Sequence, residues 1–240
     1  MSEQRVIGLR AVELIREILR THPEIRRINL FEPEPVPLAQ DRLPKDEVTR
    51  DIVTRGIALR GTYGTPFWDS VLVSCFGQGR AALAVLRQAQ FHNLGRWRDQ
   101  QVEAYQWEAG FWTQLLDDLA PERMLALSSR VCLHTGEERH LPLLDLHCPA
   151  SEQNEELAAL ATELTGVGGG FLLQSGESYH FYGKELLDGP ALVRFLGQAL
   201  LLAPVIDRAW IAHQLIEGAC ALRISNKPSG SGEPVVVRVI

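Results

Sequence analysis

The stretch LPLLDLHCP, Leu141–Pro149, places a carboxylate and an imidazole within an otherwise apolar run. Successive side chains of a β-strand point to opposite faces of the sheet, so residues two apart share a face. We therefore expect Asp145 and His147 on one face of a buried strand, close enough to share a metal ion. The residues on either side of this strand decide which fold surrounds it.

The segments around this strand alternate between strand and helix patterns. Residues 123–148 predict two strands joined by the turn TGEE, and residues 149–166 predict a helix with an acidic first turn and a terminating glycine. Residues 168–183, GGGFLLQSGESYHFYG, predict two short strands around SGES. A helix over residues 188–202 and a final strand, PVVVRVI, complete the order β-α-β-β-α-β, which ferredoxin-like and RNA-recognition-motif folds share.

The first half of the chain has a mainly helical pattern. Residues 7–20 predict an amphipathic helix, residues 80–90 and 99–119 look helical, and the proline-rich residues 31–47 predict an irregular connection. One β-type run, SVLVSCF at residues 70–76, interrupts this pattern.

Together these patterns predict an α/β (α+β) protein. Residues 121–240 would form an RNA-recognition-like core, packed on a mainly helical module of residues 1–120. The aromatic cluster of that module favours packing over a base-stacking platform; its members are Tyr105, Trp107, Phe111 and Trp112.

Composition narrows the class of protein. The chain has 240 residues, 45% of them hydrophobic, so it can bury a sizeable core. Its net charge of −6 argues against a generic basic coat for duplex nucleic acid but leaves room for a small, focused basic site. None of the four cysteines belongs to a CxxC pair, the N-terminus has no signal-peptide pattern, and the longest apolar run, Ala199–Ile206, is too short to span a bilayer. We expect a cytoplasmic protein with reduced thiols and no membrane span.

Four short polar signatures in the second half carry chemistry. They are Asp145-x-His147, Ser178-x-His180, Asp207 directly after an apolar run, and Arg223 with Lys227 in LRISNK. Each has a plain structural interpretation as well. His180 between aromatics is typical of a hydrogen-bonded core histidine, Asp207 of a helix N-cap, and Arg223 of an edge-strand charge that prevents aggregation. Their joint order along a β-α-β-β-α-β chain is more informative than any one of them.

That order resembles the archaeo-eukaryotic primase superfamily, which includes the primase-polymerases, and within it the small primase 1D-like group. The family has a carboxylate pair on a strand, then Ser-x-His, then an apolar residue followed by Asp, and finally a basic stretch. The matching segments are Asp145–His147, Ser178–His180, Ile206-Asp207 and the stretch GACALRISNK, and the resemblance covers about residues 120–240.

The resemblance implies a nucleotidyltransferase that initiates or extends a nucleic-acid strand from nucleoside triphosphates, on a single-stranded template, as in DNA replication. Two divalent ions, Mg²⁺ or Mn²⁺, would activate the attacking hydroxyl and neutralise the triphosphate. The implied catalytic and metal-binding residues are Asp145, His147 and Asp207. The implied nucleotide-binding residues are Ser178, His180, Arg223 and Lys227.

His147 departs from the family pattern, which places a second carboxylate at that position. Imidazole prefers softer transition metals, whereas Mg²⁺ prefers oxygen. The departure leaves three alternatives: use of manganese or a similar ion, one well-bound metal instead of two, or loss of catalysis.

Two other functions stay open. A catalytically weak or inactive member of the same fold would serve as a nucleic-acid or partner-binding module. Alternatively, Asp145, His147 and His180 would form a two-histidine, one-carboxylate iron site of an oxygenase. The helix Ala191–Leu202 and the aromatic first half could also form an interface with a protein partner or a second copy of the chain.

Overall fold

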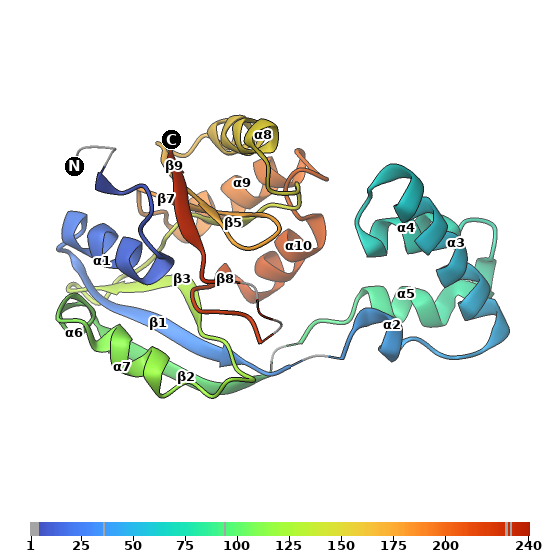
Figure 1. Cartoon of the computed structure of the whole chain (residues 1–240), viewed down its shortest axis with the longest axis horizontal. Coiled ribbons are helices and arrows are strands. Elements are labelled where there is room, and N and C mark those ends of the chain that lie inside the picture. Colours follow the sequence, from blue (N-terminus) through green and yellow to red (C-terminus); the bar gives the residue numbers. More distant parts are fainter. Residues whose placement is uncertain (1–4, 36, 94, 229, 231) are drawn as a thin grey trace. The chain divides into compact units, whose positions relative to one another are not determined.

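The computed structural model describes residues 5–240 except Val36, Leu94, Ser229 and Ser231. The chain divides into two compact units (Figure 1): Met1–Pro33 together with Gly95–Ile240, and Glu34–Leu94. The division predicted at residue 120 falls inside the larger unit. The reason is strand pairing: residues 25–33 bond on one side to residues 96–103 and on the other to residues 126–133.

One antiparallel sheet of the larger unit has the strand order β2-β1-β3-β4, and β8 also pairs with β3. Its strands are β1 (Ile25–Pro33), β2 (Arg96–Glu103), β3 (Ala126–Leu133), β4 (Glu138–His140) and β8 (Ala221–Arg223). Ile28 and Leu30 of β1 lie in the core, whereas the alternate residues Arg27 and Asn29 line a pocket on the other face. This sheet therefore has one apolar and one polar face.

A second antiparallel sheet has the order β5-β7-β6-β9. Its strands are β5 (Leu143–Asp145), β6 (Gly170–Gln174), β7 (Tyr179–Gly183) and β9 (Val235–Val239). Every residue of β7 is buried. Because β7 lies between β5 and β6, a polar side chain on β7 has to find its partners inside the protein.

The helices of this unit are α1 (Ala11–Thr21), α6 (Ala104–Glu108), α7 (Phe111–Asp117), α8 (Glu152–Glu163), α9 (Gly189–Leu200) and α10 (Arg208–Glu217). Trp107 of α6 is fully buried, and its indole N–H donates to the main-chain oxygen of Val12 in α1 at 3.1 Å. This residue of the aromatic cluster therefore packs in the core, as expected.

The mixed α+β class is confirmed, and the order β5-α8-β6-β7-α9 follows the predicted pattern. The specific RNA-recognition arrangement is not confirmed: β8 pairs with β3 of the first sheet, and β9 pairs with β6. The sequence also missed β1 and β2. The sequence of β2, RWRDQQVE, is almost entirely polar and lacks the apolar alternation that identifies strands.

The smaller unit is helical, with α2 (Ala39–Arg42), α3 (Glu47–Tyr63), α4 (Phe67–Ser74), the 3₁₀ turn η2 (Gly79–Ala82) and α5 (Leu83–Ala89). The prediction of a β-type run at residues 70–76 was wrong, because most of that run belongs to α4. Val71 and Cys75, four residues apart on one helical face, enter the core of this unit, and the Ser74 hydroxyl donates to the Ser70 carbonyl at 2.9 Å.

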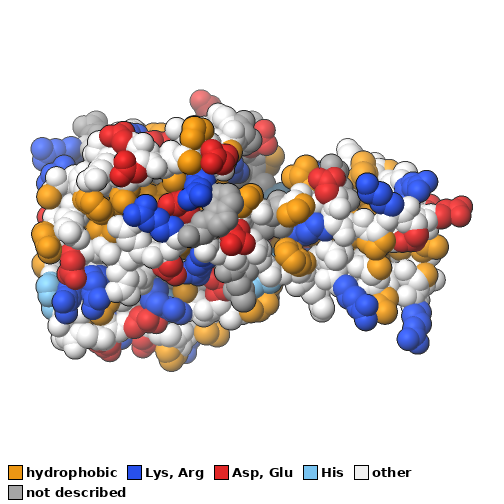
Figure 2. Space-filling model, turned by 90° about the horizontal axis from the view of Figure 1, so that it is seen from below, with side chains coloured by type: hydrophobic (Ala, Val, Ile, Leu, Met, Phe, Trp, Pro, Cys, Tyr) orange, Lys and Arg blue, Asp and Glu red, His pale blue; other side chains and the backbone are white. Residues whose placement is uncertain are grey.

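Among the described residues, no helix is long and apolar enough to cross a membrane. The face drawn in Figure 2 intersperses acidic and basic side chains on both units. Basic groups do not form a continuous coat on that face, which agrees with the net charge of −6.

Candidate active site

Strand pairing places Asp145 of β5 directly opposite His180 of β7. The imidazole Nε2 of His180 lies 3.8 Å from Oδ1 of Asp145. The His180 side chain is 7% exposed, whereas that of Asp145 is 31% exposed. Asp145 is therefore the more accessible member of the pair, and His180 lies next to it on the interior side.

Asp207 reaches the same place through a bridge between Leu146 and Ile206. Its main-chain N–H donates to the main-chain oxygen of Asp145 at 3.0 Å. Its carboxylate Oδ1 also accepts from the N–H of Trp210 at 2.9 Å, so Asp207 is the N-cap of α10. The structural and the functional interpretation of Asp207 are thus compatible, because the cap uses one of its two carboxylate oxygens.

The two acids influence each other electrostatically. Loss of hydration on burial, and then the negative charge of Asp207, raise the pKa of Asp145 to about 7. Lys227 and Arg223 oppose this rise with smaller effects. The pKa of Asp145 thus lies near neutral pH, and a second carboxylate lies beside it. A cation bound there would favour the ionised form of Asp145.

His180 is uncharged at neutral pH. Burial, followed by the positive charges of Arg223 and Lys227, lowers the pKa of its imidazole to about 3. Its Nδ1 is buried without a hydrogen-bond partner in the described part of the protein. His180 can therefore donate or accept a hydrogen bond but contributes no positive charge to a bound phosphate.

Arg223 is buried, and its guanidinium donates to main-chain carbonyls. The acceptors are Ser175 at 2.9 Å, Gly232 at 3.0 Å, and Ser225. These bonds tie the turn between β6 and β7 to the connection between β8 and β9. Because both terminal nitrogens are already engaged, the bidentate phosphate contact implied by the resemblance would require Arg223 to give up main-chain partners.

Lys227 is exposed, and no ion pair involves it among the residues that the structure describes. Its charge lowers the pKa of both Asp145 and His180, which places it within electrostatic reach of the site. Of the two basic residues, Lys227 is the one free to approach an anion.

Ser178 and His147 lie at the edge of this cluster. Ser178 closes the β6–β7 hairpin, where its carbonyl accepts from the N–H of Ser175 at 2.9 Å and Gly176 takes a positive φ of 95°. The N–H of His147 donates to the carbonyl of Val205 at 2.8 Å. Neither side chain hydrogen-bonds to Asp145 or Asp207 in the described structure.

The described residues contain no group of three or more His, Cys, Asp or Glu side chains arranged to hold a metal ion. Neither Asp145–His147–Asp207 nor the iron set Asp145–His147–His180 is thus preformed. Two adjacent carboxylates, Asp145 and Asp207, still suit one hard divalent cation, because Mg²⁺ commonly takes one or two carboxylates and fills its other positions with water and substrate phosphates.

Sequence reasoning missed Tyr182. It lies two residues beyond His180 on β7, is fully buried, and its hydroxyl has no hydrogen-bond partner in the described part of the chain. Burial raises the pKa of this phenol, and Arg223 has a smaller opposing effect. The alternation that places Ser178 and His180 on one face would have identified Tyr182 as their neighbour.

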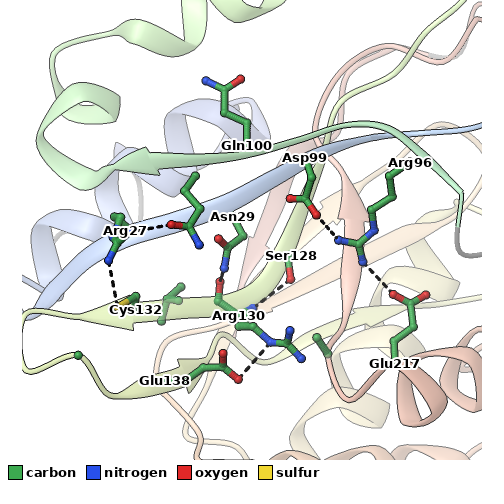
Figure 3. A pocket seen from close by; sticks show the side chains of 14 residues that line it. Arg27, Asn29, Arg96, Asp99, Gln100, Ser128, Arg130, Cys132, Glu138 and Glu217 are labelled. Atoms are coloured by element: carbon green, nitrogen blue, oxygen red, sulfur yellow. Dashed lines mark hydrogen bonds and ion pairs between the residues drawn. The ribbon is translucent and has the colours of Figure 1, made fainter.

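A separate pocket of about 500 Å³ lies on the polar face of the first sheet (Figure 3). Its polar side chains mostly pair with one another: Arg27 donates to Gln101 at 2.7 Å, Arg130 pairs with Glu138 at 3.1 Å, and Arg96 pairs with both Asp99 and Glu217 at 3.0 Å. None of its lining residues belongs to the four polar signatures. We therefore do not assign the site to this pocket.

Comparison with known families agrees with the geometry. The model of the archaeo-eukaryotic primase 1D-like family matches residues 104–234, more than half of the chain. The matched segment contains all seven residues of the polar signatures. No curated protein and no solved structure matches the chain significantly.

Proposed function

The chain belongs to the archaeo-eukaryotic primase 1D-like family, and from this membership we propose that it is a metal-dependent nucleotidyltransferase that initiates or extends a nucleic-acid strand from nucleoside triphosphates. The observation that carries the proposal is the meeting of Asp145 and Asp207 beside an unpaired Lys227. These residues come from three separate signatures, and each is of the chemical type that phosphoryl transfer needs.

The two acids would hold the metal. A bound divalent cation would supply Lewis-acid activation of the attacking hydroxyl and charge neutralisation at the phosphates. Asp145 contributes a partly exposed carboxylate, and Asp207 contributes the oxygen that is not used in capping α10. Mn²⁺ and Mg²⁺ both suit carboxylate oxygen, so the choice of ion does not depend on His147.

The remaining residues would bind and orient the substrate. Lys227 would attract the triphosphate as a mobile point charge, and Ser178 would offer a hydroxyl at the end of the hairpin. His180, neutral and buried next to Asp145, would offer a hydrogen bond to the substrate. Ser178 and Lys227 lie in two connecting segments, and Arg223 would hold both segments in place. Its buried guanidinium would also add a fixed positive charge near them.

The direct test is strand synthesis with a labelled primer on a single-stranded template, with Mg²⁺ or Mn²⁺ and all four nucleotides. Asp145→Asn and Asp207→Asn should each lower the rate about 100-fold or more, since metal activation is worth several kcal/mol. Glu177→Gln is the matched control, because Glu177 is an exposed acid in the β6–β7 hairpin next to Ser178. This variant should keep the wild-type rate. Equal activity of all four proteins would refute the assignment of the acids.

A second candidate is a non-catalytic member of the family that binds nucleic acid or a protein partner. It is favoured by one observation, the absence of a preformed three-ligand metal group in the described residues. It predicts no metal-dependent nucleotide binding by the wild-type protein, so a titration of labelled ATP with and without Mn²⁺ separates the two candidates before any synthesis assay.

A further inference from the structure

We propose that a pocket next to Lys227 receives one nucleotide of a single-stranded nucleic acid, an inference that rests on the proposed function. The pocket has a volume of about 480 Å³ and lies in the larger unit. Trp112 and Leu116 of α7 line one side, and Asn226 and Lys227 of the β8–β9 connection line the other. A single nucleotide occupies a space of this order.

The position of the pocket links it to the acids. Lys227 lines the pocket and also acts electrostatically on Asp145. A strand bound here would thus lie against the same cation that acts electrostatically on the candidate metal site. Of the seven signature residues, Lys227 is the one that lines this pocket, so the pocket is separate from the acids.

Trp112 supplies an unused hydrogen-bond donor. The indole N–H of Trp107 donates to Val12 at 3.1 Å and that of Trp210 donates to Ala221 at 3.2 Å. By contrast, Nε1 of Trp112 is buried and has no partner in the described part of the protein. A buried donor without a partner is unfavourable, and an acceptor from a ligand would remove that cost. Sugar hydroxyls, base carbonyls and phosphate oxygens all qualify.

The lining combines apolar surface with cations and with two acids, Asp117 and Glu233. Leu116, Leu119 and Pro121 offer an apolar side for a base. The two arginines that line the pocket are already paired: Arg10 lies 3.1 Å from Glu13, and Arg123 lies 2.9 Å from Glu32. Lys227 is therefore the cation that remains for a phosphate. One unpaired cation beside an apolar surface and two acids suits a single nucleotide, which combines a base with a phosphate, better than a ligand that carries only phosphates.

Arg10 also orients the aromatic ring. Its guanidinium carbon lies 5.1 Å from the centre of a Trp112 ring, within the range of a cation–π contact. The ion pairs of Arg10 with Glu13 and Glu233 hold the guanidinium in place. Trp112 is thus fixed before a ligand arrives, which reduces the entropy lost on binding.

Two exposed neighbours on α7 provide the test. Thr113 lines the pocket and Gln114 does not, so Thr113→Glu and Gln114→Glu introduce the same charge one residue apart. Binding of a fluorescein-labelled twelve-residue oligothymidylate, without metal or nucleotide, is followed by anisotropy. We expect Thr113→Glu to weaken binding about tenfold, roughly 1.4 kcal/mol, and Gln114→Glu to stay within about twofold. Equal affinity of the two variants would overturn the proposal.

A second measurement keeps the result independent of folding and of the proposed function. The same oligonucleotide with 5-iodouracil should cross-link to Trp112 on irradiation, as located by peptide mass spectrometry, and Trp112→Leu, which removes the aromatic ring, should lose the adduct. Adducts confined to other regions, or a wild-type protein that binds no oligonucleotide, would overturn the pocket. Binding of ATP with Mn²⁺ is measured in parallel: if it is absent while the adduct forms, the proposed function fails and the strand pocket stands.

Discussion

The main-chain N–H of Asp207 donates to the main-chain oxygen of Asp145 at 3.0 Å. This bond joins the residue after an apolar run to the end of β5, so two acidic residues are neighbours in the fold. Burial, followed by the negative charge of Asp207, raises the pKa of Asp145. The backbone therefore holds two like charges together, which is useful at a cation site and costly elsewhere.

Substitution of Asp207 separates its structural role from its chemical one. Asn is as good an N-cap as Asp, so Asp207→Asn should leave the melting temperature nearly unchanged, whereas Asp207→Ala should cost about 1 kcal/mol, or about 2–4 °C. Both should abolish Mn²⁺-dependent nucleotide binding. Asp188 caps α9 through the N–H of Ala191 at 2.8 Å, so Asp188→Ala is the control that loses a cap and keeps binding. If nucleotide binding instead followed the strength of the N-cap, so that Asp207→Asn still bound nucleotide and Asp207→Ala did not, the metal role of Asp207 would be contradicted.

The pKa of Asp145 predicts how stability depends on pH. The carboxyl binds its proton more tightly in the folded state, so its contribution to stability is fully present below its ordinary pKa of about 4 and is lost as pH rises through about 7. Without metal, the wild-type protein should therefore lose more stability between pH 5 and pH 8 than Asp145→Asn does. Urea unfolding at both values measures the difference.

Added Mn²⁺ extends the same experiment. It should restore stability at pH 8 in the wild-type protein and have little effect at pH 5, where the proton competes with the metal. An identical pH dependence in wild-type and Asp145→Asn protein would show that Asp145 titrates normally.

The sequence predicted the mixed α+β class, and the roles that it assigned to the site residues remain predictions. Asp145, His180 and Asp207 could be proposed as neighbours because a strand alternates its faces and the signatures follow a known order. The role of Arg223 could not be predicted, since its acceptors include the main-chain carbonyls of Ser175 and Gly232. Every residue has such a carbonyl, so the amino-acid sequence does not indicate which ones accept.

Local patterns failed where long-range contacts decide the structure. The polar strand β2 exists because β1 offers it hydrogen bonds, from Arg27 opposite Glu103 through Phe31 opposite Asp99. The β-branched run at residues 70–76 is helical because Val71 packs against Gly56. In both cases the tertiary partner overrides the local propensity.

Replacement of Arg223 tests its role as a link between the β6–β7 turn and the β8–β9 connection. Arg223→Lys keeps the charge but cannot reach three carbonyls, and it leaves buried acceptors unpaired, so we expect a loss of about 2–4 kcal/mol in unfolding free energy. Arg238→Lys is the matched control, because Arg238 is 42% exposed and lies 3.6 Å from Glu155; it should change stability by less than about 0.5 kcal/mol. A stable Arg223→Lys protein with weakened ATP binding would instead indicate direct phosphate contact.

Two glycines of α3 test the packing of the smaller unit. A Cβ at Gly56 would lie 2.7 Å from Cγ2 and 2.9 Å from Cα of Val71, whereas a Cβ at Gly61 would meet nothing within 4 Å. Gly56→Ala should therefore force α3 and α4 apart and cost about 1–3 kcal/mol, while Gly61→Ala should be neutral or stabilising by up to about 1 kcal/mol, because alanine favours the helix. Hydrogen exchange resolved by residue would place the loss in residues 34–94 and leave β5 and β7 protected. If Gly56→Ala were as stable as Gly61→Ala, the close approach of the two helices at Val71 would be disproved.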